Sequence, residues 1–168
     1  ADMAFSTDSI SKSYAPSEVE ADILARWDDA NIGHSSVDTD AVPFSILIPP
    51  PNVTAALHFG HALNGTLQDI LVRWHRMKGE ATLWMPGTDH AGIATQSVVE
   101  KRLMQLEGKK RTDFSREEFI RRVQAWKDEY EVTILSQLKS IGASCDWDRT
   151  RFTMDDVCEA AVREAFFQ

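Results

Sequence analysis

Short apolar runs alternate along the chain with longer segments in which apolar residues recur every three to four positions. The runs at 44–48 (FSILI) and 81–85 (ATLWM) are typical of buried strands in a parallel sheet. Prolines follow both runs, Pro49 to Pro51 after the first and Pro86 after the second, and proline cannot donate to a strand ladder. A helical pattern follows each strand. The sequence therefore predicts an α/β fold, a Rossmann-like parallel sheet with helices on its faces.

Start and stop signals mark the expected helices. They are 17–32, capped by Ser17 and followed by Gly33; 58–78; 91–106, closed by Gly108; 116–141, between Ser115 and Gly142; and a last helix from about Asp155. Residues 146–153 are expected to form a loop or a short strand. In the helix at 58–78 the apolar residues gather in one stripe, which we expect to face the core: Leu63, Leu67, Ile70, Leu71 and Trp74.

Three parts are expected along the chain. Residues 1–16 are polar and Ser-rich, which favours a flexible tail and not a secretory signal. Residues 17–42 are a helix and a linker, and 43–168 contain the sheet. Two strands make a small sheet, because sheets average about five or six, so this part resembles one half of a domain. No apolar run approaches the ~20 residues of a membrane helix, which predicts a cytoplasmic protein without a membrane partner.

The net charge of the chain limits the kinds of partner that it is expected to bind. The formal net charge of −8 argues against a generally basic protein that binds DNA or other nucleic acids along its surface. One segment is locally basic, and it is either a solvated helix face or a surface that contacts phosphates. Its cations are Lys101, Arg102, Lys109, Lys110, Arg111, Arg116, Arg121 and Arg122. The two cysteines, Cys145 and Cys158, lack metal-site spacing and are expected to be reduced thiols.

Two histidines open the helix at 58–78. His58 and His61 fall on the side opposite the apolar stripe, which argues against histidines buried in the core. The first turn of a helix after a parallel strand carries unpaired N–H groups and the positive end of the helix dipole. Ligands of open α/β sheets bind at this edge. We expect an anion site, with imidazole N–H donors and with Gly60 leaving room for a base or sugar.

The second strand ends in the sequence PGTDHAG, which brings Asp89 and His90 to the same edge of the sheet. Asp89 has two interpretations. It is either the N-cap of the following helix or a carboxylate that receives the ammonium group of a substrate.

Four stretches together resemble a known family: PPPNVT, LHFGHALN, GTDHAGIATQ and SCDWDRTRFTMD, in this order. HFGH, residues 58–61, resembles the His-x-Gly-His motif of class I aminoacyl-tRNA synthetases, and its flanks are similar to the valyl-tRNA synthetase family. The resemblance implies the first half of a Rossmann-type catalytic domain. It also implies activation of valine with ATP to valyl-adenylate and transfer of the valyl group to tRNA(Val), which is expected to be bound mainly through regions this chain lacks.

The resemblance also implies roles for residues of this chain. His58 and His61 are the expected catalytic residues, binding the ATP phosphates and stabilising the transition state. The expected ATP-binding residues are Thr54, His58, Gly60, His61 and His90. The expected valine-binding residues are Pro50, Pro51, Asn52 and Asp89. ATP with Mg²⁺ is expected as a substrate complex, without a metal held by the protein or a tightly bound cofactor.

The chain departs from the family pattern in two ways. Ala55 stands where the family has glycine. The editing insertion, the second half of the catalytic fold with its Lys-Met-Ser-Lys-Ser loop, and the anticodon-binding region are not in this sequence. We therefore expect the 168 residues alone to be inactive or very weak. One alternative is a nucleotide or amino-acid binding module without catalysis. Another, disfavoured by the lack of His-Glu-x-x-His, is a metal hydrolase using His58, His61 and either Asp89 or His90.

Overall fold

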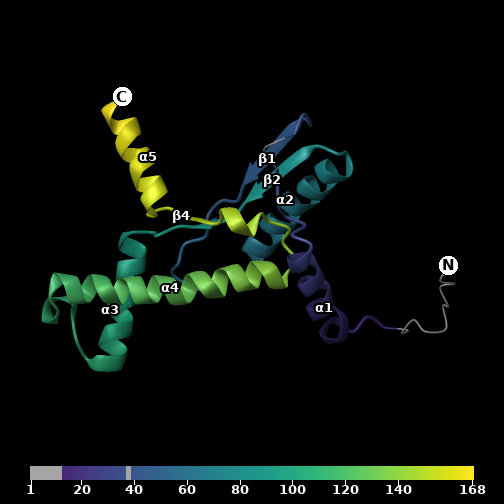
Figure 1. Ribbon diagram of the computed structural model, residues 1–168. Coiled ribbons are helices and arrows are strands. Elements are labelled where there is room, and N and C mark those ends of the chain that lie inside the picture. The colour runs from purple at the N-terminus through teal and green to yellow at the C-terminus, as the bar shows by residue number, and fades with distance from the viewer. Residues whose placement is uncertain (1–12, 37–38) are drawn as a thin grey trace, which may run out of the picture. The chain divides into compact units, whose positions relative to one another are not determined.

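The computed structural model describes residues 13–36 and 39–168. Most of the expected tail, residues 1–12, lies outside the described residues. The chain divides into two compact units, one ending at Asn31 and the other running from Ile32 to Gln168. The first contains helix α1 (Pro16–Asp29; Figure 1). The expected cap at Ser17 is wrong. The N-cap is Ala15, which makes no side-chain cap, and Pro16 takes the first helical position, where its missing N–H costs nothing.

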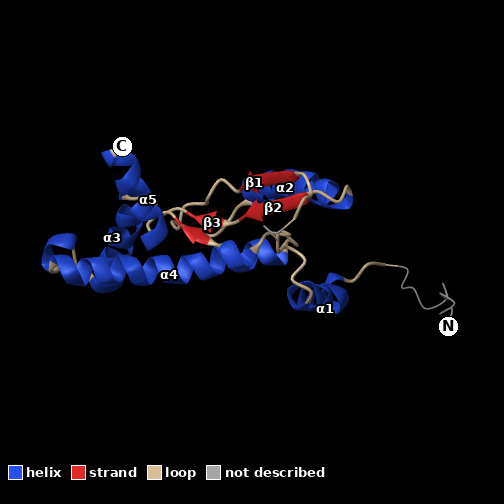
Figure 2. Cartoon of the chain, turned by 45° about the horizontal axis from the view of Figure 1, so that its top comes forward, coloured by secondary structure: helices blue, strands red, loops and turns tan. Residues whose placement is uncertain are grey.

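A parallel strand pair lies at the centre of the second unit. Strand β1 (Pro43–Leu47) pairs with β2 (Ala81–Met85), with Pro43 beside Ala81 and Leu47 beside Met85. Helix α2 (Phe59–Met77) connects the two strands and packs along them (Figure 2). Parallel neighbours need such a crossover. The expected strand–helix–strand order is confirmed, and with it the α/β interpretation.

The apolar stripe of α2 does not face the core. Its five residues are between 47% and 57% exposed, so the expected orientation is wrong. The buried residues of α2 are Gly65 and Val72. Polar side chains bond into the interior beside them: Gln68 Oε1 accepts from Trp84 Nε1 at 3.0 Å, and Asp69 accepts from the hydroxyl of Ser144. Hydrogen-bonded polar groups thus hold α2 to the rest of the unit, and the stripe stays exposed.

A second, very short parallel pair joins β3 (Gly87–Thr88) to β4 (Arg151–Phe152). The expected loop or short strand at 146–153 therefore contains a 3₁₀ turn (Trp147–Arg149) and then β4. This pairing brings the loop after β2 close to a segment more than sixty positions later in the chain.

The remaining helices follow the expected signals. Helix α3 (Ile93–Glu107) ends at Gly108, whose φ is 66°. A 3₁₀ turn (Arg111–Asp113) leads to α4 (Arg116–Ser140), where Ser115 Oγ accepts from the N–H of Glu118. Helix α5 (Asp156–Phe167) is capped by Asp155. Within 13–36 and 39–168, no helix has the length and apolar character needed to cross a membrane.

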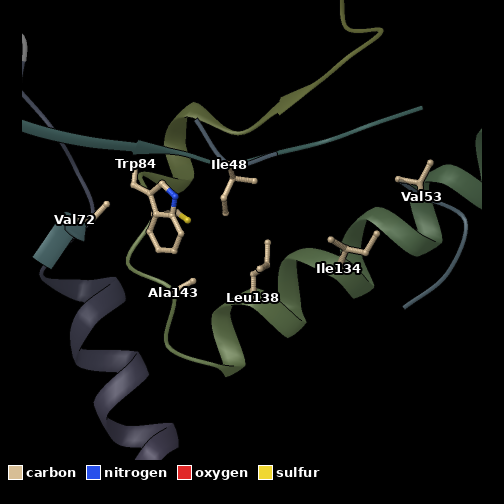
Figure 3. Close-up of a cluster of buried hydrophobic side chains, with 8 residues drawn as sticks. Ile48, Val53, Val72, Trp84, Ile134, Leu138 and Ala143 are labelled. Atoms are coloured by element: carbon tan, nitrogen blue, oxygen red, sulfur yellow. The ribbon is translucent and has the colours of Figure 1, made fainter. Parts of the chain in front are cut away.

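The core lies between the strands and the carboxyl-terminal half of α4. Ile48, Trp84 and Leu138 point into a shared space (Figure 3), and Ile134 is fully buried farther along α4. Cys145 belongs to this cluster, and burial raises the pKa of its thiol. Both cysteines are free thiols, as expected. A second cluster joins α3 to the first half of α4, and its members are Val99, Leu103, Phe119 and Trp126.

Candidate functional site

The loops that leave the carboxyl ends of β1 and β2 run side by side. Asn52 and Asp89 form a parallel bridge. The N–H of Asp89 donates to the carbonyl of Pro51 at 2.8 Å, and the N–H of Val53 donates to the carbonyl of Asp89 at 3.0 Å. Three expected site residues, Pro51, Asn52 and Asp89, are therefore brought together. Pro50 beside them is exposed and Pro51 is buried.

His58 and His61 cap the helix that they open. His58 is the N-cap of α2, and its Nδ1 accepts from the N–H of Gly60 at 3.0 Å. His61 Nδ1 reaches back and accepts from the N–H of His58 at 3.2 Å. The two ring centroids are 4.0 Å apart. Each ring thus satisfies one of the unpaired donors at the start of the helix.

These caps determine which nitrogen of each ring carries the proton. A neutral imidazole has one acceptor and one donor nitrogen. Because Nδ1 accepts in both rings, Nε2–H is the remaining donor in both. Burial, and then the neighbouring His58, lower the pKa of His61 and favour its neutral form. The first turn of α2 therefore offers two imidazole N–H donors at a positively polarised helix end.

Gly60 leaves room for the capping ring of His58. A Cβ at this position would lie 2.9 Å from Cε1 of His58, so the ring would have to shift from its capping position. Thr54 is half-buried in the turn that precedes the helix. Ala55, the departure from the family pattern, needs no left-handed backbone: the described non-glycine residues with positive φ are Asn31 and Ala91.

Asp89 is not the N-cap of the next helix, so that interpretation is wrong. The N-cap of α3 is Gly92, without a side-chain cap. Asp89 Oδ1 instead accepts from the hydroxyl of Thr153 at 2.8 Å. Its other oxygen, Oδ2, accepts no hydrogen bond from the described part of the chain, and the side chain is 32% exposed. Asp89 therefore retains acceptor capacity for a ligand.

Thr153 joins Asp89 to His90, and sequence reasoning missed it. Its Oγ1 lies 3.0 Å from the backbone N and 2.7 Å from the Nδ1 of His90. Since the hydroxyl proton goes to Asp89, the oxygen accepts from both nitrogens. His90 then carries a proton on Nδ1 and has Nε2 as an acceptor.

Helix α4 supports the loop between β1 and α2, which sequence reasoning also missed. Trp126 Nε1 donates to the buried carbonyl of Val53 at 3.0 Å. The N–H of Leu57, immediately before His58, donates to Gln137 Oε1 at 2.8 Å. Both contacts fix the backbone that carries Thr54 and His58.

The described residues do not favour the metal-hydrolase alternative. His58 and His61 do not form a three-ligand group with Asp89 or His90. Ligand atoms converge within 4.8 Å at His34, Asp146 and Asp148. There, Arg149 Nε lies 3.7 Å from Asp146 Oδ2, so a protein cation already compensates the buried carboxylate.

Comparison with known proteins covers almost the whole chain. The family of class I tRNA synthetases (I, L, M and V) matches residues 22–168. A valine–tRNA ligase of Rhodopirellula baltica is 59% identical over 149 residues, which are 88% of this chain and 14% of the relative. The valine–tRNA ligase of Desulfotalea psychrophila is 56% identical over 157 residues, and that of Chlamydia pneumoniae is 49% identical over 160. They cover 94% and 95% of this chain, and it covers 18% and 17% of them.

A solved structure shows the same fold. It is the ternary complex of Agrobacterium radiobacter K84 agnB2 LeuRS-tRNA-LeuAMS, with a TM-score of 0.75 and 18% identity, covering 92% of this chain and 18% of that one. This chain therefore spans less than a fifth of the length of the proteins that it resembles.

Proposed function

Because the chain belongs to the class I tRNA synthetases of the isoleucine, leucine, methionine and valine group, we propose that it supplies ATP-binding and amino-acid-binding parts of a valine–tRNA ligase. Relatives named as valine–tRNA ligases, at 49% to 59% identity, support valine as the amino acid. Residues 43–168 then form the first half of a catalytic domain. The substrates are valine, ATP with its Mg²⁺, and tRNA(Val), and the location is the cytoplasm.

The observation that carries this proposal is the capping arrangement of His58 and His61. It leaves an Nε2–H donor on each ring at the start of α2. When the valine carboxylate attacks the α-phosphate, negative charge grows on the phosphoryl oxygens and on the departing pyrophosphate. Donors held in place before the reaction stabilise this charge without reorganising, typically by ~10²–10³ in rate for each donor.

The neighbouring loops supply the other binding groups. Asp89 receives the valine ammonium on its open oxygen, with Asn52 beside it and Pro50 and Pro51 as a wall against the isopropyl group. Thr54 lies on the phosphate side. Gly60 lies under the base, and the Nε2 acceptor of His90 is available to a ribose hydroxyl.

An NMR titration of the 168-residue chain with MgATP tests the proposal. The ring signals of His58 and His61 should shift, because the phosphates approach Nε2–H of both rings. His75 is an internal control, since its ring stacks on Phe44 and bonds to Glu80 and should not respond. A His58→Gln, His61→Gln variant should lose ATP affinity, and an exposed control, His34→Gln, should retain it. Unchanged His58 and His61 signals at saturating ATP would defeat the phosphate role.

Activity of this chain alone should be very low in valine-dependent ATP–pyrophosphate exchange. The resemblance places a second set of phosphate donors on a Lys-Met-Ser-Lys-Ser loop that is not in this sequence. Losing two donors at ~10²–10³ each forfeits on the order of 10⁴–10⁶ in rate. Turnover within about tenfold of a full-length valine–tRNA ligase would show that these residues carry the chemistry by themselves.

A further inference from the structure

Helix α4 carries an ion pair against the short strands that lead to Asp89. The Nζ of Lys127 lies 2.8 Å from Oε2 of Glu131, one helical turn farther along. The two side chains are only 14% and 20% exposed, so water and salt screen this pair less than a pair on the open surface. Neither side chain belongs to the candidate site, but each contacts a strand that supplies one of its residues.

The second oxygen of Glu131 holds strand β3. Its Oε1 accepts from the hydroxyl of Thr88 at 2.8 Å. Thr88 is fully buried and immediately precedes Asp89. A buried hydroxyl is costly without a partner, so this bond favours one placement of the backbone from which Asp89 extends.

Lys127 contacts the neighbouring strand, β4. Its Nζ lies 4.6 Å from the centroid of the Phe152 ring, which is a cation–π contact. The same ring meets the ring of His90 edge-on, with the centroids 6.4 Å apart. Phe152 precedes Thr153, whose hydroxyl donates to Asp89. The ion pair therefore contacts β3 and β4 just before each strand supplies one partner of this hydrogen bond.

We propose that Glu131 is a positioning residue that orients Asp89 for a substrate ammonium group. Glu131 acts through Thr88, with Lys127 holding its carboxylate in place. Asp89 is bonded through one oxygen only, so the direction of its other oxygen depends on where the backbone of β3 is held. A carboxylate that is oriented before the ligand arrives binds it without a further cost of ordering. The ammonium part of this inference rests on the proposed function.

Hydrogen exchange measured by NMR tests the positioning without a ligand. The N–H of Asp89 and the N–H of Val53 bond across the two loops beside Thr88. Glu131→Ala should lower the protection of both amides at least about tenfold, because the backbone at Thr88 is no longer held. The amide of Ile48, which bonds between the β1 and β2 segments, should keep its protection.

Matched variants separate the hydrogen bond from a general effect on α4. Glu131→Gln should retain most of the protection, because its amide oxygen still accepts from Thr88. Glu129→Ala removes an exposed carboxylate of the same helix and should change nothing. Thr88→Val removes the hydroxyl, and its effect should not add to that of Glu131→Ala, because both remove the same bond. Circular dichroism checks that each variant is folded.

Calorimetry with valine, and with isovalerate, which lacks the amino group, measures the consequence for binding. Glu131→Ala should lower the affinity for valine at least about tenfold, because Asp89 no longer meets the ammonium group in a fixed orientation. The affinity for isovalerate should not change, whereas a general loss of structure would lower both affinities together. The MgATP response of His58 and His61, at the start of α2, should also be retained.

The outcomes distinguish this role from the proposed function. Unchanged amide protection in Glu131→Ala, an equal loss in Glu129→Ala, or parallel losses of valine and isovalerate would each overturn the positioning role. Lost protection with an unchanged affinity for valine would overturn it as well. If the unsubstituted chain binds valine no better than isovalerate while Glu131→Ala loses protection at Asp89, the proposed function is contradicted and the hold of Glu131 on this backbone is supported.

Discussion

At the scale of the residue, the caps occupy one ring nitrogen of His58 and of His61 and leave the other as a donor. The Nδ1 atoms accept backbone N–H groups, and Nε2–H is left for a ligand. Serine or aspartate caps a helix equally well, but neither then presents a second, oriented N–H donor. Under the proposed function, this second donor favours imidazoles at the start of α2.

The lowered pKa of His61 predicts a dependence of stability on pH. The unfolded chain takes up a proton at this residue near pH 6.5, whereas the folded chain does so only at lower pH. Between these values the unfolded state binds more protons, so stability falls as pH falls. The urea midpoint should therefore decrease on going from about pH 7.5 to about pH 5.5, and His61→Asn should reduce that decrease. An identical decrease with and without His61 would contradict the assignment.

Ala91 predicts an unusual response to glycine. Its φ of 53° lies in the left-handed region, which costs an L-residue about 1 kcal/mol or more. Ala91→Gly removes that cost but adds about 0.5–1 kcal/mol of unfolded-state entropy, so the free energy of unfolding should stay the same or rise slightly. Ala125→Gly, at an exposed position inside α4, is the control and should lose about 1 kcal/mol. Chemical denaturation of both variants measures these free energies of unfolding. Equal losses in the two variants would show that position 91 is not strained.

At the scale of the element, the sequence predicted boundaries well because their signals are local. Pro49 to Pro51 follow β1 within two residues, Gly108 ends α3, and Ser115 and Asp155 cap the helices after them. The orientation of α2 was predicted wrongly. A helical wheel identifies the apolar face, but it does not show that Gln68 and Asp69 find buried partners on another face.

Trp126 connects two elements through one hydrogen bond, and its removal should be costly. Trp126→Phe retains an aromatic ring but leaves the buried carbonyl of Val53 without its donor, which should cost about 1–3 kcal/mol. ATP affinity should also fall, because this carbonyl precedes Thr54 in the phosphate-side loop. Trp74→Phe on the exposed stripe is the matched control, expected within about 0.5 kcal/mol of the parent. Denaturation and ATP titration of both variants measure the difference, and equal effects would argue against the contact.

At the scale of the whole molecule, the site depends on contacts that a single sequence does not reveal. Motif spacing identified His58, His61 and Asp89 because each follows a strand end. Thr153 lies 64 positions from Asp89, and Gln137 lies 80 positions from Leu57. No periodicity links such pairs. They meet only because the parallel pairing of β3 with β4, and the packing of α4, bring distant segments to one edge.

One apolar surface, at the edge of β1 and along the stripe of α2, has no partner within the described part of the chain. Among the described residues β1 pairs only with β2, and Leu47 on β1 is 66% exposed. Leu67, Leu71 and the rest of the stripe on α2 are about half exposed. Apolar surface of this extent, together with an open strand edge, favours association.

The chain should therefore self-associate as its concentration rises, and the stripe should be responsible. Leu67→Glu with Leu71→Glu places two charges on the stripe, so it should shift the chain toward monomer in sedimentation velocity. The free energy of unfolding should change little in the monomer, because neither side chain is in the core. Thr66→Glu is the control, since it adds a charge at an exposed position of α2 outside the stripe. Association that persists in the double variant, or that is lost equally in the control, would assign the contact to the edge of β1 or to net charge instead.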